Sequence, residues 1–203
     1  MVITRLEDVG QSKIKVYIDY QYAFLLYQKD IEKLELAEGI EISRVYFETI
    51  LEDTILRRAK QKAIAILKFM DRTELELRTK LIDAGYPEAV VEQTINYVSE
   101  YGFLNDERFV SAYVRAKMHT KSKRVIKTEL QQKGIPKDII EQIFSEEYEE
   151  DGGNEDAELI AIRKAIAKKT KKPETLTYEE KQRLMASLYR KGFQISKIKQ
   201  LLS

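Results

Sequence analysis

The sequence predicts a mainly α-helical protein whose tandem three-helix repeats form an elongated, curved solenoid, preceded by a small N-terminal extension with a β-hairpin and a short helix. Charged residues make up 34% of the 203 residues, with only 8 Gly and 3 Pro, a composition typical of helices with many solvent-facing positions. Apolar residues recur at helical spacing over most of the chain. A glycine-centred motif occurs three times, in segments that begin at Leu81, Leu130 and Leu188.

The N-terminal extension, residues 1–50, carries the period-two pattern of a β-strand. Lys13 to Asp19 alternates apolar with polar residues, and a second apolar run covers Tyr22 to Tyr27. Two such runs in close succession predict a hairpin, although the connector Tyr20-Gln21 lacks the Asn-Gly type of turn signal. Three further segments complete the predicted extension: a third strand at 2–6, a short helix at 29–36 and a longer helix that begins near residue 41.

The glycine-centred motif predicts a tight corner between two helices. Each copy has a leucine four residues before Gly85, Gly134 or Gly192 and an apolar residue directly after the glycine. A glycine at this position adopts the left-handed conformation that ends a helix, and the apolar residue then folds back on the last turn. The first two copies continue with Pro87 and Pro136, which we expect at the first position of the next helix.

These corners divide the rest of the chain into three repeats, at residues 51–103, 104–152 and 153–203. Thr73 with Glu76 and Thr177 with Glu180 predict capping boxes, and Asn105 is expected to cap the helix that follows it. The predicted helices are 52–70, 73–84 and 87–101, then 106–119, 122–133 and 136–148, then 155–169, 177–191 and 194–202. Two apolar stripes are expected to face the core: Ala59, Ala63, Ile66, Leu67 and Met70, and Phe109, Ala112, Tyr113 and Ala116.

Signals for catalysis are missing from the sequence. Neither a Gly-x-x-x-x-Gly-Lys loop nor a Gly-x-Gly-x-x-Gly fingerprint occurs, there is no cysteine, and His119 is the single histidine. Neighbouring acids such as Glu146 and Glu147 do not face each other on a helix, which predicts a solvated surface. We therefore expect a protein that is not an enzyme and uses no cofactor or metal. The lack of a long apolar run and of a signal peptide predicts a cytoplasmic location without a membrane partner.

Charge is distributed in blocks, although the net charge is only +1. Residues 108–137 hold nine bases and one acid, residues 138–158 ten acids and no base, and residues 159–172 six bases and no acid. Solvated helix faces explain any single block equally well. If stacking aligns the basic segments, they form a track that follows a phosphate backbone without reading sequence. The candidate residues are Arg57, Arg58, Lys62, Arg115, Lys117, Lys121, Lys123, Arg124, Lys127, Lys133, Arg163, Lys164 and Lys168.

Aromatic residues near the basic block have two interpretations. Tyr101, Phe103 and Tyr113 could stack on bases. A place in the core explains them better, because aromatic residues at helical spacing are more often buried.

Three segments of the sequence resemble the RecX family. The stretch from Tyr101 to Phe109 resembles the motif that joins the first two repeats of the family, and Lys123 to Ile135 is similar to its distinctive second-repeat helix. Thr73 to Leu81, with Gly85, resembles the first-repeat counterpart. The likeness covers about residues 55 to 200, and the preceding head resembles the variable N-terminal extension of some members. One departure is that Lys121-Ser122 stands where the family pattern has a glycine.

This resemblance implies a mainly negative regulator of the RecA recombinase. Members of the family bind in the helical groove of the RecA filament on single-stranded DNA and modulate recombination, DNA repair and the SOS response. By this analogy, the candidates for filament or DNA contact with the best support are Lys123, Arg124, Lys127 and Lys133, and the acidic block meets basic patches on the protein partner. The expected partners are the RecA filament and single-stranded DNA, with weak duplex binding, and the chain is expected to be a monomer. Charge reversal at 123, 124 and 127 should abolish inhibition and preserve the fold, because these positions are expected to be exposed.

Two alternatives remain open. A stand-alone helical nucleic-acid-binding module would bind DNA tightly without a recombinase, although the sequence lacks a symmetric dimer signature. A helical-repeat adaptor without nucleic acid would bind its partner independently of salt.

Overall fold

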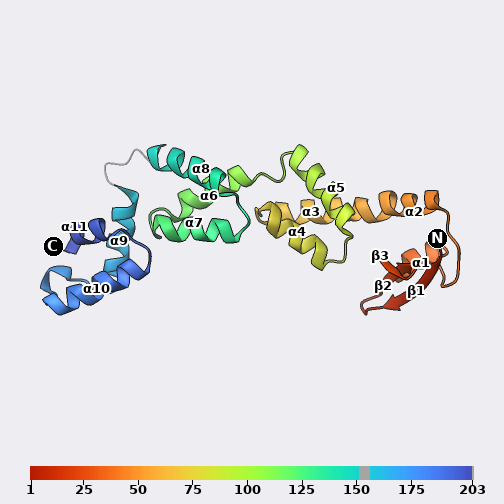
Figure 1. The fold of residues 1–203 in the computed structure, drawn as a ribbon, viewed down its shortest axis with the longest axis horizontal. Helices are drawn as coiled ribbons and strands as arrows, with labels where there is room; N and C mark the ends of the chain where they lie inside the picture. Colours follow the sequence, from red (N-terminus) through yellow and green to blue (C-terminus); the bar gives the residue numbers. More distant parts are fainter. Residues whose placement is uncertain (151–155, 203) are drawn as a thin grey trace. The chain divides into compact units, whose positions relative to one another are not determined.

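The computed structural model describes residues 1–150 and 156–202, which fall into two compact units, Met1–Asn105 and Asp106–Ser203 (Figure 1). Most described residues are helical, and a three-stranded sheet lies at the N-terminal end. The predicted mainly α class with tandem three-helix units is therefore confirmed. The curvature of the whole chain and its division into four domains stay predictions. Within the described part of the chain, no helix combines the length and apolar character needed to cross a bilayer.

The sheet is antiparallel in the order β1-β2-β3, with β1 at Ile3–Asp8, β2 at Lys13–Ile18 and β3 at Gln21–Tyr27. The predicted hairpin and third strand are confirmed, but the predicted connector is wrong by one residue. Asp19 and Tyr20 form the turn, with φ of 46° and 67°. Two successive left-handed residues make the type I′ turn, whose twist matches that of the strands it joins.

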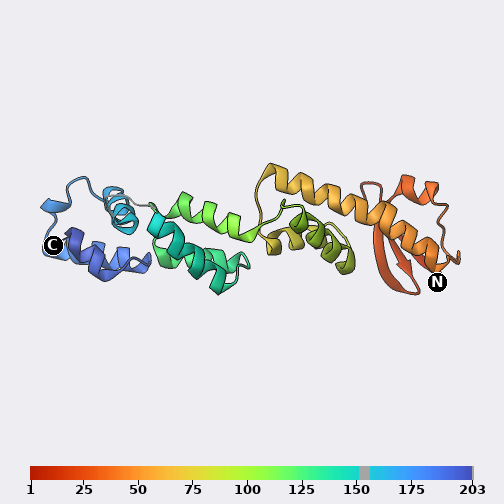
Figure 2. The same cartoon turned by 90° about the horizontal axis from the view of Figure 1, so that it is seen from above.

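A long helical run crosses unit one next to the sheet (Figure 2). The short helix α1 (Gln28–Lys33) follows β3, and the run then comprises α2 (Arg44–Ile50), the π-helical segment η1 (Leu51–Leu56) and α3 (Arg57–Phe69). Residues 50 and 51, where the sequence places the start of repeat one, lie inside this run. Its residues Ile50, Ile55 and Ala59 share one hydrophobic core with Phe24 and Leu26 of the sheet. The apolar sheet face is thereby removed from water, which is the main stabilising term for such a small sheet.

The three glycine corners have the predicted geometry. Gly85, Gly134 and Gly192 have φ of 86°, 85° and 87°. The N–H of the residue after each glycine donates to the carbonyl of the motif leucine: Tyr86 to Leu81 at 3.2 Å, Ile135 to Leu130 at 3.1 Å and Phe193 to Leu188 at 3.3 Å. These are the hydrogen bonds of a Schellman motif, which satisfies carbonyls at the end of a helix.

The helices on either side of the first corner, α4 (Glu74–Asp83) and α5 (Glu88–Glu100), also confirm the predicted cap at Thr73. A capping box joins Thr73 and Glu76, and a second one joins Thr177 and Glu180. The prediction for Pro87 is wrong by one position. With ψ of 148° it is the N-cap residue of α5 rather than its first helical residue, and its carbonyl accepts from Val90 and Val91.

Unit two contains the helices of the second and third repeats. They are α6 (Asp106–Lys117), α7 (Lys123–Gln132), α8 (Lys137–Glu150), α9 (Ala157–Ala167), α10 (Tyr178–Arg190) and α11 (Ile195–Leu202), with a 3-10 turn, η2, at Pro173–Thr175. One core joins α6, α7 and α8, and another joins α9, α10 and α11. The predicted start of a helix at residue 155 lies outside the described residues.

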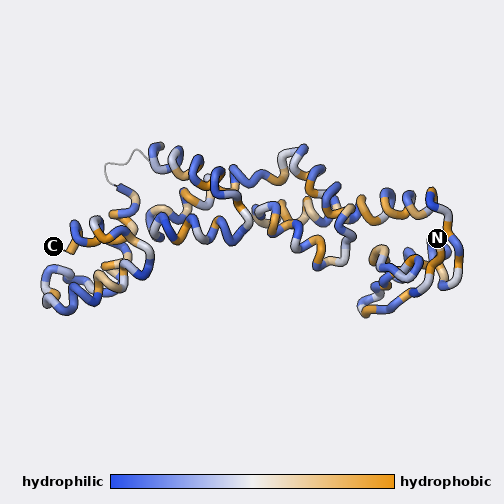
Figure 3. Tube along the Cα trace, viewed as in Figure 1, coloured by the Kyte–Doolittle hydropathy of each residue, from blue (hydrophilic) through white to orange (hydrophobic). Residues whose placement is uncertain are grey.

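Hydropathy along the chain shows why each helix buries one face, since apolar positions recur between hydrophilic ones (Figure 3). In α3 the predicted stripe through Ala59, Ala63 and Leu67 is buried, but Met70 is exposed. In α6 the predicted stripe is correct for Phe109 and Tyr113, which are partly buried and pack against the core, and wrong for the two alanines. The fully buried residues are Val110 and Val114 of α6 and Met118 directly after it, whereas Ala112 and Ala116 face solvent. Apolar residues of α6 cover a wider face than the one that packs on the core. The packing centres on the branched side chains that directly follow Phe109 and Tyr113.

Candidate binding surface

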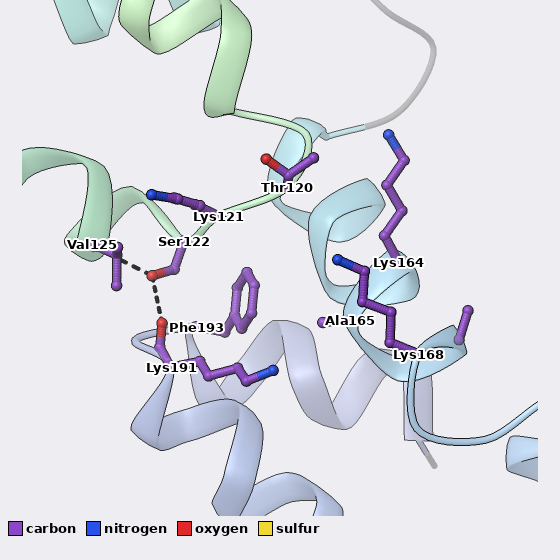
Figure 4. Close-up of a pocket in the computed structure, with 10 residues that line it drawn as sticks. Thr120, Lys121, Ser122, Val125, Lys164, Ala165, Lys168, Lys191 and Phe193 are labelled. Atoms are coloured by element: carbon purple, nitrogen blue, oxygen red, sulfur yellow. Dashed lines mark hydrogen bonds between the residues drawn. The ribbon is translucent and has the colours of Figure 1, made fainter.

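The N-terminus of α7 is anchored on the glycine corner of the third repeat (Figure 4). The hydroxyl of Ser122 accepts from the N–H of Val125 at 3.3 Å as the N-cap of α7, and donates to the carbonyl of Lys191 at 2.8 Å. Ser122 is only 1% exposed. A Cβ on Gly192 would lie 2.6 Å from this hydroxyl oxygen. Glycine at the corner thus permits both its left-handed turn and its close approach to α7.

A cavity of ≈ 590 Å³ lies beside this junction, and we call it the junction pocket. Phe193, Ala165 and Val125 supply apolar lining. The cations that line it are Lys121, Lys164, Lys168 and Lys191. In Figure 4 the side chains of Lys168 and Lys191 extend toward the space around the Phe193 ring, whereas that of Lys164 extends away from it.

Three of the four lysines are exposed and make no salt bridge among the described residues, and the fourth, Lys121, is paired. The ammonium group of Lys121 pairs with Glu129, to which the hydroxyl of Tyr113 also donates. Burial alone would raise the pKa of Glu129, but the hydrogen bonds from Lys121 and Tyr113 outweigh it and lower this pKa. Lys164, Lys168 and Lys191 are exposed, and among residues 1–150 and 156–202 no carboxylate forms a salt bridge with them. Like charges around a concave surface raise the local concentration of anions.

The other cations of α7 are engaged with α8. Nζ of Lys123 lies 3.8 Å from the centre of the Tyr148 ring. Lys127 pairs with Glu141 and lies 5.0 Å from the centre of the Phe144 ring. The expectation that Lys123, Arg124 and Lys127 are all exposed is therefore correct only for Arg124, since the two lysines are half-buried. Reversing the charge of these two lysines would place carboxylates against α8 and weaken its packing. A loss of inhibition in that variant would therefore not distinguish lost binding from lost stability.

One acid of the block at 138–158 is an internal counter-charge rather than a solvated residue. Glu147 is 5% exposed and pairs with Arg115 of α6. The prediction that Glu147 belongs to a solvated face is wrong because Ile140, Ile143 and Phe144 place this face of α8 on the core. The spacing of Glu147 from Ile140 and Ile143, seven and four residues, is the sequence signal that identifies its face.

The remaining candidate cations differ in how far the fold engages them. Arg58 makes two hydrogen bonds to the carboxylate of Asp30, of 2.5 and 2.8 Å, and lies 5.4 Å from the centre of the Tyr27 ring. Lys117 and Lys133 are half-buried, whereas Arg57, Lys62 and Arg163 are exposed. That Arg57 and Lys62 of unit one continue a basic track stays a prediction.

The structure brings together Lys121, Lys164 and Lys168 of the predicted set, and it adds Lys191. The sequence analysis missed Lys191 because it relied on long blocks of charge, whereas Lys191 has only Arg190 beside it before Gly192. Its place in the corner motif is the signal that finds it. Of the aromatic residues with two interpretations, Tyr101 is 66% exposed and Phe103 37% exposed, so a core position is wrong for both. The described residues contain no group of three or more His, Cys, Asp or Glu side chains that could hold a metal ion.

The geometry defines a class of protein, a tandem three-helix-repeat protein with a lysine-lined pocket at the junction of its second and third repeats. Models of the first, second and third three-helix domains of RecX match residues 59–97, 105–143 and 156–202. The chain belongs to the RecX family of regulatory proteins.

Two relatives are similar to this chain over nearly its whole length. Regulatory protein RecX of Caldanaerobacter subterraneus subsp. tengcongensis is 30% identical, with 100% of this chain and 99% of the relative covered. That of Clostridium acetobutylicum is 29% identical, with 98% and 94% covered. A crystal structure of regulatory protein RecX has a TM-score of 0.60 at 20% identity over 99% of this chain and 98% of the other, which supports the fold. RecX from Lactobacillus salivarius has a TM-score of 0.57 at 25% identity, with 72% and 96% covered.

Proposed function

We propose that this protein is a non-enzymatic, mainly negative regulator of a RecA-type recombinase. It binds in the groove of the recombinase filament on single-stranded DNA, as a cytoplasmic monomer, and thereby modulates recombination, DNA repair and the SOS response. Membership of a regulatory family supports this proposal. The observation that carries it is the junction pocket, which lysines of the second and third repeats line. The three from the third repeat, Lys164, Lys168 and Lys191, make no salt bridge among the described residues.

A cationic site of this kind suits an anionic filament, whose charges are the carboxylates of its protein as well as the phosphates of its DNA. Each ammonium group that neutralises a phosphate releases a bound counterion, so affinity falls as salt rises. Three phosphate contacts would give a slope of about −2 for the logarithm of the association constant against the logarithm of salt concentration on a single strand. The same charges support weak binding to duplex DNA.

The arrangement of α7 weighs against a stand-alone module that reads duplex DNA. A recognition helix presents free side chains to the base edges in the major groove. In this protein the half-buried Lys123 and Lys127 lie against Tyr148 and Phe144 of α8. A protein that binds as part of a larger assembly is more consistent with this surface.

ATP hydrolysis by the recombinase on single-stranded DNA tests the proposal. Adding the full chain is expected to lower the rate in proportion to its concentration, with strong inhibition at or below one chain per filament subunit. The chain with ATP and DNA but without recombinase is the control, and it should hydrolyse no ATP. An unchanged rate at stoichiometric ratios would contradict the proposal.

A further inference from the structure

We infer that the junction pocket binds an acidic segment of a protein partner, which inserts one apolar side chain between its carboxylates. This inference rests on the proposed function and deepens it, because it assigns the pocket to the protein of the filament. Contacts with the DNA are left to exposed cations outside the pocket, such as Arg57 and Lys62. Two features of the pocket carry the inference: the apolar lining and the lysines that surround it.

The lining provides a place for an apolar side chain. Phe193 is 3% exposed and Ala165 is 8% exposed, so both are fixed parts of the core. The cavity of ≈ 590 Å³ lies within the range of about 300–1,000 Å³ typical of sites that enclose a ligand. A leucine or phenylalanine side chain would lose its contact with water there, and such anchors supply much of the binding energy at protein interfaces.

The lysines determine the charge of the ligand. Lys168 and Lys191 are the C-cap residues of α9 and α10. The carbonyl ends of helices carry partial negative charge, which favours cations and repels bare anions. An anion held there therefore depends on the ammonium groups. The side chains of Lys168 and Lys191 extend toward the space around Phe193 (Figure 4). Carboxylates on either side of an apolar anchor in the ligand would pair with these two ammonium groups.

The pocket fits a peptide better than a nucleic acid strand. Proteins that bind single strands offer exposed aromatic faces on which bases stack, next to a groove that follows the backbone. The aromatic ring of this pocket, Phe193, lines the cavity but is only 3% exposed, too little for a base to stack on its face. The lysines come from the start of α7 and the ends of α9 and α10, so they surround a cavity instead of forming a line.

Fluorescence anisotropy with the full chain and three labelled probes tests the inference. The probes are a peptide of acidic residues around a central leucine, the same peptide with serine in place of leucine, and an oligothymidylate. The leucine peptide is expected to bind at least about threefold more tightly than the serine peptide, because only leucine fills the apolar part of the pocket. Equal affinities for the two peptides would overturn the inference.

Two matched double variants locate the site. Lys168→Glu with Lys191→Glu reverses the pocket lysines, whereas Lys169→Glu with Arg190→Glu makes the same charge change at the adjacent positions. All four residues are exposed, so both variants should unfold at the same temperature. The pocket variant is expected to lose at least about tenfold in affinity for the leucine peptide, and the control less than about threefold. Equal losses would contradict the site. A loss confined to the oligothymidylate would assign the pocket to nucleic acid and overturn the inference.

Inhibition of the recombinase ATPase separates this inference from the proposed function. The pocket variant is expected to inhibit at least about tenfold less effectively than the control variant. If the unaltered chain inhibits and the pocket variant inhibits equally well, the inference fails while the proposed function stands. If the unaltered chain does not inhibit, the proposed function fails. The anisotropy measurements with the three probes then decide whether the pocket binds an acidic peptide.

Discussion

Replacing Arg58 by alanine will lower the free energy of unfolding by about 3 kcal/mol, the cost of removing one partner of a buried ion pair. Arg58 of α3 binds both carboxylate oxygens of Asp30 in α1, and Asp30 is 7% exposed. Without the guanidinium, the largely buried carboxylate keeps its charge, with the N–H of Tyr27 as its remaining donor among the described residues. Urea denaturation followed by circular dichroism measures the change. This expectation differs from that of the sequence, which places Arg58 among the DNA contacts.

The double variant Arg58→Ala with Asp30→Asn is the control for this effect. It removes the stranded charge and should recover at least about 1 kcal/mol. Hydrogen bonds from Arg58 hold the pKa of Asp30 below its usual value. A lowered pKa in the folded state stabilises the protein above the unfolded pKa of about 3.9, and this stabilisation is lost as the pH falls through the folded pKa. The difference between wild type and Arg58→Ala should therefore shrink below about pH 4, and a constant difference would contradict this explanation.

Replacing Gly192 by alanine is expected to cost about 2–4 kcal/mol. The left-handed conformation, with φ of 87°, costs an alanine about 1–2 kcal/mol. The new methyl group would also lie 2.6 Å from the Ser122 hydroxyl oxygen, so the hydrogen bond from Ser122 to Lys191 must lengthen or break. Urea denaturation monitored by circular dichroism gives the total, and the peptide probes report whether the junction pocket has changed shape.

Gly39→Ala is the matched control, because Gly39 has φ of 83° and a Cβ added to it would meet nothing within 4 Å. It carries the conformational cost alone and should lose only about 1–2 kcal/mol. Ser122→Ala combined with Gly192→Ala should cost less than the sum of the single changes, because the hydroxyl that meets the methyl group is gone. Equal costs for Gly192→Ala and Gly39→Ala would show that the approach to α7 does not constrain the corner.

Local rules explain why the helix ends were predictable. Gly85, Gly134 and Gly192, with the leucine four residues before each, specify hydrogen bonds within a few residues of the glycine. The capping box at Thr73 and Glu76 is equally local. Such signals do not depend on how the rest of the chain packs. The helices therefore end within a few residues of the positions predicted from these motifs.

The candidate site was less predictable because its features depend on packing between helices. Charge blocks identified Lys123 and Lys127 as cations, but only the position of α8 shows that aromatic rings and Glu141 cover them. In α6 the apolar band was wide enough for two faces, and the neighbouring helices select Val110 and Val114. Lys191 lies beside the other lysines only because the third-repeat corner packs against Ser122, a contact between helices far apart in the sequence.

Hydrogen–deuterium exchange of the full chain, alone and on a saturated recombinase filament, tests most directly whether the junction pocket is the binding surface. We expect slower exchange on the filament at residues 118–123, 168–170 and 191–194, which border the pocket outside or at the ends of helices. No comparable change is expected at residues 9–12, the turn between β1 and β2. Protection that leaves the three pocket segments unchanged would show that the filament binds a different surface.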